Sequence, residues 1–253
     1  MVPSRRSVLL LAATAGLAVL ATACGASAGP APAATGTPRA TGGASATTAP
    51  ARPGTDPAAS RDLLAAARSG DAAAVRDAVR RGADLETRDE QRRTPLLLAA
   101  TGDHVEAAEA LVAAGADPDA LDQRHDTPWL VTGVTGSAAM ARVLAKAGPD
   151  YTIVNRYGGT SLIPAGEHGH ADYVREVTTN PAVRVDVDHV NDLGWTALLE
   201  AVVLGDGGPE HQETVRLLLA AGADRSIADT SGTTPLEHAV EKGQTEVARL
   251  LRG

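Results

Sequence analysis

The stretch TPLLLAATGDHVEAAEALVAAGAD, residues Thr94–Asp117, decides the fold, because variants of it recur along the chain. A Thr opens five copies, and Arg61 occupies the same place in a degenerate first copy, so the copies begin near residues 61, 94, 127, 160, 196 and 234. The first four starts are evenly spaced, and the last two intervals are slightly longer. Such a period predicts a stack of similar units, each burying its apolar face against its neighbours.

Each copy is expected to contain a short inner helix, a tight loop, a longer outer helix and an extended turn, here called the finger. The Thr hydroxyl can cap the inner helix, and the Pro that follows it in three copies fits the first helical turn. A Gly nine residues after the start, replaced by Asp103 in the second copy, suits a left-handed turn between the helices. An Asp or Asn five residues before each Thr can close the finger; these are Asp89, Asp122, Asn155, Asn191 and Asp229.

This pattern resembles the ankyrin-repeat family, whose signature combines T-P-L with a period of about 33 residues. The resemblance covers residues 58–253 and implies an all-α ankyrin-repeat solenoid of about six repeats with β-turn fingers. A narrower resemblance, over residues 155–212, is to exported bacterial ankyrin-repeat proteins, and it implies an interaction protein of the cell envelope without catalysis. The family's usual His after T-P-L is missing here; its places hold Leu97, Leu130, Ile163, Leu199 and Glu237.

Composition limits the possible partners. The formal net charge of −8 argues against nucleic acid or an anionic membrane surface as the main partner, since both require a basic footprint. Phe is absent and aromatic residues are few, which suits a stack of Ala- and Leu-rich helices. The single cysteine, Cys24, excludes an intrachain disulfide and a cysteine-based zinc site.

Residues 1–23 are expected to form an export signal, in which Arg5 and Arg6 precede an apolar stretch of small and branched residues. The segment Ala21–Cys24 resembles a bacterial lipobox, which implies lipidation of Cys24 and a location at the outer face of the cell membrane. An ordinary signal would instead release the protein to the periplasm or the exterior. The arginine pair also resembles a twin-arginine signal, although two arginines occur in ordinary signals too.

Residues 24–57 are dominated by Ala, Gly, Pro, Thr and Ser. Residues of this kind cannot bury enough apolar surface to offset the entropy of ordering, so this segment is predicted to be a disordered linker. The repeat domain is then expected to occupy residues 58–253.

No catalytic motif is present: the chain lacks G-x-S-x-G, a phosphate loop and H-E-x-x-H, and it is not expected to be an enzyme. Glu167 and Glu200 could face each other on neighbouring inner helices, but solvated surface is the preferred interpretation. Four histidines surround two insertions, at residues 179–188 and 205–212; they are His168, His170, His189 and His211. Repeat spacing alone does not bring three of them together as a zinc site requires, so neither a metal nor another cofactor is expected.

The two insertions leave an alternative open, because insertions in repeat arrays fall in loops that often bind. That alternative is a ligand or metal sensor built from repeats four and five. Hydrolase activity in the same region is a third possibility.

Fingers and inner helices of repeat arrays form extended concave surfaces, which predicts a monomeric scaffold for an unidentified partner protein. Tyr157 and Trp195 stand on neighbouring fingers, and Trp, Tyr and Arg are frequent in interaction hot spots. The two rings could instead only pack finger against finger, whereas Trp129, in place of the Leu of T-P-L, is expected in the core. The residues predicted to contact the partner are Arg93, Arg124, Arg156, Tyr157, Glu167, His168, Leu193 and Trp195.

Overall fold

The structure is a computed structural model that describes residues 54–253. The predicted signal peptide, Cys24 and the predicted linker up to residue 53 lie outside these residues. The described part forms twelve α-helices, and none of them is long and apolar enough to cross a membrane. Their bounds are Pro57–Ser69 (α1), Ala72–Arg80 (α2), Pro95–Thr101 (α3), Val105–Ala113 (α4), Pro128–Thr135 (α5), Ala138–Ala145 (α6), Leu162–Glu167 (α7), Ala171–Thr179 (α8), Ala197–Val203 (α9), Pro209–Ala220 (α10), Pro235–Glu241 (α11) and Thr245–Arg252 (α12).

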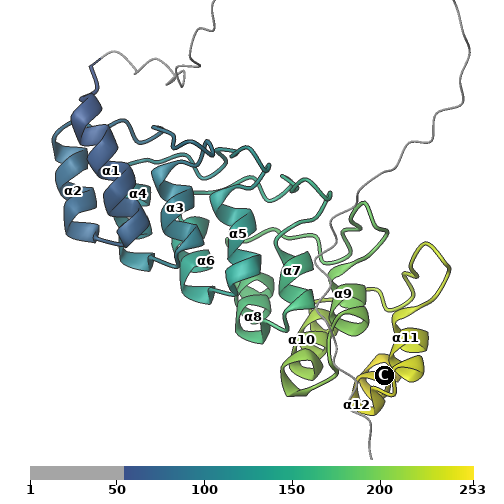
Figure 1. Ribbon diagram of the computed structural model, residues 1–253. Coiled ribbons are helices and arrows are strands. Elements are labelled where there is room, and N and C mark those ends of the chain that lie inside the picture. The colour runs from purple at the N-terminus through teal and green to yellow at the C-terminus, as the bar shows by residue number, and fades with distance from the viewer. Residues whose placement is uncertain (1–53) are drawn as a thin grey trace, which may run out of the picture. The chain divides into compact units, whose positions relative to one another are not determined.

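The helices of residues 54–253 stack in two rows (Figure 1). The inner row contains α1, α3, α5, α7, α9 and α11, and the outer row contains α2, α4, α6, α8, α10 and α12; each helix contacts the next one in its row. Fingers connect each outer helix to the next inner helix and project on the same side of the inner row (Figure 1). The predicted all-α solenoid of about six repeats is confirmed.

The Thr that opens a repeat caps its inner helix in four of the five copies. The Oγ1 atoms of these Thr residues accept a hydrogen bond of 3.1–3.3 Å from the backbone N–H three residues later; they are Thr94, Thr127, Thr196 and Thr234. The first helix begins at Pro57, and Asp56 caps it by accepting the N–H of Ala58 at 2.7 Å.

The predicted cap is wrong at Thr160, whose buried hydroxyl has no hydrogen-bond partner among the described residues. In the other copies the residue four places after the Thr donates its N–H to the carbonyl of that Thr. Pro164 stands at this place and has no N–H to donate. Helix α7 therefore begins late, at Leu162, and its six residues make it the shortest of the twelve.

The fingers close as predicted, through the Asp or Asn before each repeat. In the finger before α7, Oδ1 of Asn155 accepts the N–H groups of Tyr157 at 2.9 Å and of Gly159 at 3.0 Å. The same pair of bonds forms at the other four positions, Asp89, Asp122, Asn191 and Asp229. Neighbouring fingers also bond to each other, since the N–H of Asp192 donates to the carbonyl of Tyr157 at 2.9 Å.

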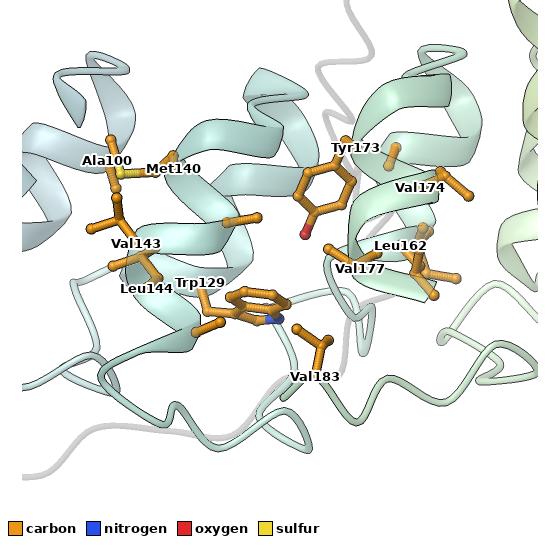
Figure 2. Close-up of a cluster of buried hydrophobic side chains, with 14 of the residues drawn as sticks. Ala100, Trp129, Met140, Val143, Leu144, Leu162, Tyr173, Val174, Val177 and Val183 are labelled. Atoms are coloured by element: carbon orange, nitrogen blue, oxygen red, sulfur yellow. The ribbon is translucent and has the colours of Figure 1, made fainter. Parts of the chain in front are cut away.

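Trp129 lies in the core, as predicted, with 2% of its surface exposed. Its ring meets that of Tyr151 edge to face, with 4.8 Å between the centroids. Val183, from the insertion at residues 179–188, is also buried near this ring (Figure 2), and the Tyr151 hydroxyl donates to the carbonyl of Ala182 at 3.2 Å. The insertion of repeat four therefore extends the core.

Two glycines allow neighbouring inner helices to approach closely. A Cβ atom added at Gly133 of α5 would lie 1.8 Å from the carbonyl oxygen of Ser161, and one at Gly166 of α7 would lie 2.3 Å from that of Ala197. Both distances are far below van der Waals contact, so the stacking of α5, α7 and α9 depends on these glycines.

Candidate partner-binding surface

A cavity of about 330 Å³ opens between the inner helices α5, α7 and α9 and the three fingers that precede them. Seven of the eight residues predicted to contact a partner line it: Arg124, Arg156, Tyr157, Glu167, His168, Leu193 and Trp195. Arg93 is not part of it. That side chain lies in the finger before α3, where its Nε and Nη2 atoms donate to Asp89 at 2.9 and 2.8 Å.

The rim of the cavity is apolar. Seven large hydrophobic side chains are exposed within residues 54–253, and four of them line this one cavity: Val134, Tyr157, Leu193 and Leu204. About half of each side chain is exposed, from 49% for Leu204 to 58% for Leu193. A contiguous exposed apolar patch with a polar surround is typical of an interaction site.

Tyr157 is held from one side by its neighbour in sequence. The guanidinium carbon of Arg156 lies 4.3 Å from the ring centroid, and Nη2 donates to the Tyr157 hydroxyl at 3.0 Å. The ring contacts of the described residues join Trp129 to Tyr151 and His168 to His170, and neither involves Tyr157 or Trp195. No ring contact therefore joins Tyr157 to Trp195 among the described residues; both side chains line the cavity, Tyr157 half exposed and Trp195 partly buried.

The positive charges on the finger side gather around one carboxylate. Oδ2 of Asp126 lies 3.8 Å from Nε of Arg124 and 4.0 Å from Nη1 of Arg156. Burial raises the pKa of Asp126, and the neighbouring charge of Asp122 raises it further. On the finger side of the cavity, the positive charges of Arg124 and Arg156 are therefore partly balanced by Asp126.

Glu200, on α9, is a wall residue of the cavity that the sequence analysis placed on the solvated surface, and this interpretation is wrong. Only 4% of Glu200 is exposed. Its Oε1 atom accepts a hydrogen bond of 3.1 Å from Nδ2 of Asn191, the residue that closes the finger before α9. Burial raises the pKa of Glu200 to about 7, and the charge of Glu167 contributes to this rise.

The spacing of polar residues within the repeats indicates the pairing of Asn191 with Glu200. Asn191 precedes Glu200 by nine residues, and Asp229 precedes His238 by the same interval in the next repeat. In the structure Nε2 of His238 lies 2.8 Å from Oδ2 of Asp229. Both repeats therefore place a polar side chain of the inner helix against the residue that closes the finger.

The histidine of the repeat-five insertion has a structural role. Nε2 of His211 lies 2.9 Å from the carbonyl oxygen of Glu167, and Nδ1 lies 2.8 Å from Oδ1 of Asp206. His104 and His170 make the same type of contact, at 3.1 Å, with a carbonyl of the preceding repeat. Across residues 54–253 no group of three or more His, Cys, Asp or Glu side chains is placed to hold a metal ion.

The insertion at residues 205–212 lies outside the 330 Å³ cavity, although Leu204 borders both. The expected left-handed turn occurs at Gly207 (φ 70°) and not at Gly205, where an added Cβ would lie 2.1 Å from the carbonyl oxygen of Ala201. Nε2 of Gln244 holds the loop by donating to the carbonyls of Val202 and Gly205, both at 3.0 Å.

A second depression, of about 420 Å³, lies beside the starts of α8 and α10 and includes two insertion residues, Pro209 and Glu210. Its main charges satisfy each other, since Nη2 of Arg175 donates to Glu213 at 2.9 Å. The hydrogen bond from Arg216, assisted by Arg175, lowers the pKa of Glu213 to about 2. This depression is a surface ion-pair network.

The comparison with known proteins agrees with this architecture. The family model described as ankyrin repeats (3 copies) matches residues 63–155 and 165–253. Among curated proteins, the ankyrin repeat protein YahD of Escherichia coli (strain K12) is 47% identical over 96 residues, which are 38% of this chain and 47% of that relative. The chain therefore matches less than half of that relative's length.

Solved structures cover more of the chain. A crystal structure of an ankyrin repeat domain from Acinetobacter baumannii AYE is 42% identical, with a TM-score of 0.70, and the match covers 75% of this chain and 95% of that one. A second ankyrin repeat protein is 37% identical (TM-score 0.72; 76% and 97% covered). The ankyrin repeat domain of Bcl-3, of the IkappaB family, is 27% identical (TM-score 0.66; 76% and 84% covered). This chain belongs to the ankyrin-repeat family.

Proposed function

We propose that this protein is a non-catalytic scaffold that holds a partner protein on the cavity of repeats three to five. Ankyrin arrays act as protein-binding scaffolds, and nothing in the family match points to catalysis. The observation that carries the proposal is the gathering of aromatic, aliphatic and arginine side chains at one cavity. Such side chains are the ones that contribute most to interaction hot spots.

The proposal is tested by replacing both cavity aromatics, in the variant Tyr157→Ala with Trp195→Ala. After crosslinking in intact cells, mass spectrometry should identify a protein joined to the wild type and lost from the double variant, with helical content unchanged by circular dichroism. A matched control is Leu121→Ala with Val190→Ala, which removes exposed apolar side chains that do not line the cavity. Equal recovery of the partner with the aromatic double variant would rule out this site.

We also propose that the scaffold is exported and anchored at the cell envelope through a lipid on Cys24. The support is sequence alone: an arginine-containing apolar signal, followed by a lipobox-like Ala21–Cys24 segment. Labelling with a radioactive fatty acid should mark the wild type and not Cys24→Ala. An unlabelled wild type would exclude the anchor and leave release to the periplasm or the exterior as the remaining form of export.

A further inference from the structure

The charged side chains around the cavity form two groups: those on the finger side lie close to a side chain of opposite charge, and the carboxyl groups on the helix side do not. On the finger side, Arg124 and Arg156 flank Asp126. On the helix side, Glu167 of α7 and Glu200 of α9 line the same cavity, and neither takes part in an ion pair with another described residue. The helix side of the cavity therefore carries two carboxyl groups that pair with no Lys or Arg, beside the imidazole of His168.

Glu200 occupies a position where a carboxyl group is costly. The residues four places after the opening Thr of the preceding repeats are Leu98, Val131 and Pro164, all apolar. Burying a carboxylate without a full set of partners destabilises a protein, because the lost hydration is not replaced. Asn191 supplies one hydrogen bond, to Oε1, and Oε2 receives none from the described residues.

In the sixth repeat the same position holds a histidine that contacts a carboxylate. There His238, a potential cation, lies 2.8 Å from the carboxylate of Asp229. In the fifth repeat the closing residue is the neutral Asn191, and the inner-helix residue is the acid. The acid of the fifth repeat thus lacks the basic partner that its counterpart in the sixth repeat has within the chain.

The walls around these carboxyl groups suit a long basic side chain. Trp195, Leu204 and Val134 offer apolar surface for an aliphatic stem, of the kind that Lys and Arg cover while their charged ends remain solvated or paired. Tyr157 already has one cation, Arg156, over its ring at 4.3 Å, and aromatic faces attract cations electrostatically. A volume of about 330 Å³ is at the small end of the usual range for ligand pockets, about 300–1,000 Å³.

We infer that Glu167 and Glu200 receive the ammonium or guanidinium group of a Lys or Arg side chain from an extended segment of the partner protein, with Trp195 and Tyr157 against its stem. This inference rests on the proposed function and specifies the chemistry of the partner. The raised pKa of Glu200 makes this binding depend on pH, since a bound cation favours the charged carboxylate. Binding should therefore strengthen as the pH rises through about 7.

Other charged and titratable groups surround Glu200, and His168 is the one that lines the same cavity on the helix side. Helix α9 packs against α7, α10 and α11. On α10, Glu213 pairs with Arg175 and Arg216, and His211 contacts Asp206; on α11, His238 contacts Asp229. The charged or titratable groups on these helices and at their ends, and on the finger before α9, are Glu167, His168, Arg184, Asp186, Asp188, His189, Asp192, Glu210, His211, Glu213, Arg216, Glu237, His238, Glu241 and Lys242. Among them the charge of Glu167 is the one that raises the pKa of Glu200.

The test uses a phage-displayed library of random 12-residue peptides, selected on the full-length protein purified in detergent. The wild type should enrich peptides with Lys or Arg at one fixed position, and selection on Glu200→Gln should lose that preference. For one enriched peptide, Glu200→Gln should weaken binding about tenfold or more, as should replacement of the peptide's basic residue by Met. The two changes together should cost little more than either alone.

Matched controls distinguish a failure of this inference from a failure of the proposed function. Glu90→Gln removes an exposed finger-tip carboxylate outside the cavity and should leave binding unchanged. Peptides enriched without a basic preference, or a basic preference that survives Glu200→Gln, would overturn the inference and leave the proposed function standing. The proposed function itself would be contradicted if the enriched peptides bind the variant Tyr157→Ala with Trp195→Ala as tightly as they bind the wild type. It would also be contradicted if selection on the wild type enriches no peptide relative to selection on that variant.

Discussion

Replacing Glu200 by Gln should stabilise the protein above neutral pH and remove part of its pH dependence. Gln keeps the length of the side chain and an oxygen that can accept the Nδ2 hydrogen of Asn191, but it carries no charge to bury. The effect should depend on pH, because the pKa of Glu200 rises from its ordinary value of 4.5 to about 7 in the folded protein.

The sign and size follow from linkage. A raised folded pKa means that the native state binds a proton which the unfolded state has already lost, so the contribution to stability is complete below pH 4.5 and disappears as the pH rises through about 7. One pKa unit corresponds to about 1.4 kcal/mol, so the upper limit is roughly 3 kcal/mol. Screening and local relaxation reduce this, and we expect a loss of about 1–2 kcal/mol between pH 5 and pH 8.

The assay is urea unfolding followed by circular dichroism, at intervals from pH 5 to pH 8.5. Wild type, Glu200→Gln and the exposed-carboxylate control Glu90→Gln are compared, because other groups titrate in all three proteins. The free energy of unfolding of the wild type should fall relative to that of Glu200→Gln as the pH rises, while Glu90→Gln follows the wild type. Parallel curves for wild type and Glu200→Gln would refute the argument that Glu200 is a buried, shifted carboxyl group.

Three further predictions concern the scaffold and are read as changes in the free energy of unfolding. Gly133→Ala should cost about 2–3 kcal/mol or more, because its Cβ would lie 1.8 Å from the Ser161 carbonyl oxygen. The control Gly159→Ala, whose Cβ would lie 3.4 Å from its nearest atom, should cost much less. Equal losses of stability would contradict the close approach of the helices. His125→Gly should stabilise by about 0.5–1 kcal/mol, since this residue has a left-handed φ of 62° at the place where the later fingers have Gly; a destabilised variant would contradict this. Gln244→Ala should cost about 1–3 kcal/mol, because it removes a donor to the Val202 carbonyl and one of two donors to the Gly205 carbonyl, the other being Nζ of Lys242; an unchanged midpoint would show that the loop does not depend on Gln244.

The repeat pattern predicts much of the fold because each of its signals acts locally. A Thr that caps a helix or an Asn that closes a finger needs only a few neighbours in sequence, so the residues that do this could be read from their spacing. Thr160 shows the limit, because the Pro four residues later removes the donor that the same turn uses elsewhere. The Gly205 expectation failed for a similar reason, since the insertion moved the left-handed turn to Gly207.

The candidate site was only partly predictable. The sequence placed Tyr157 and Trp195 on neighbouring fingers, and the structure brings both to the cavity wall, where Tyr157 is exposed and Trp195 is half-buried. Arg93 is also a finger residue but stands at the finger before α3, away from the fingers that line the cavity. Glu200 was assigned to the surface because it is a carboxylate, although its position in the repeat is apolar in the preceding copies and its partner Asn191 stands at a repeated nine-residue interval.

Site-specific photocrosslinking tests the central claim, that the cavity of repeats three to five holds a protein partner. A benzophenone amino acid placed at Leu193, which is 58% exposed at the cavity, is compared with one at Arg76, an exposed residue of the outer helix α2. In intact cells the Leu193 position should give a protein adduct of defined mass, which disappears when Tyr157 and Trp195 are both replaced by Ala, and the Arg76 position should give none. Equal adducts from both positions, or an adduct that survives the loss of both aromatic rings, would contradict the account.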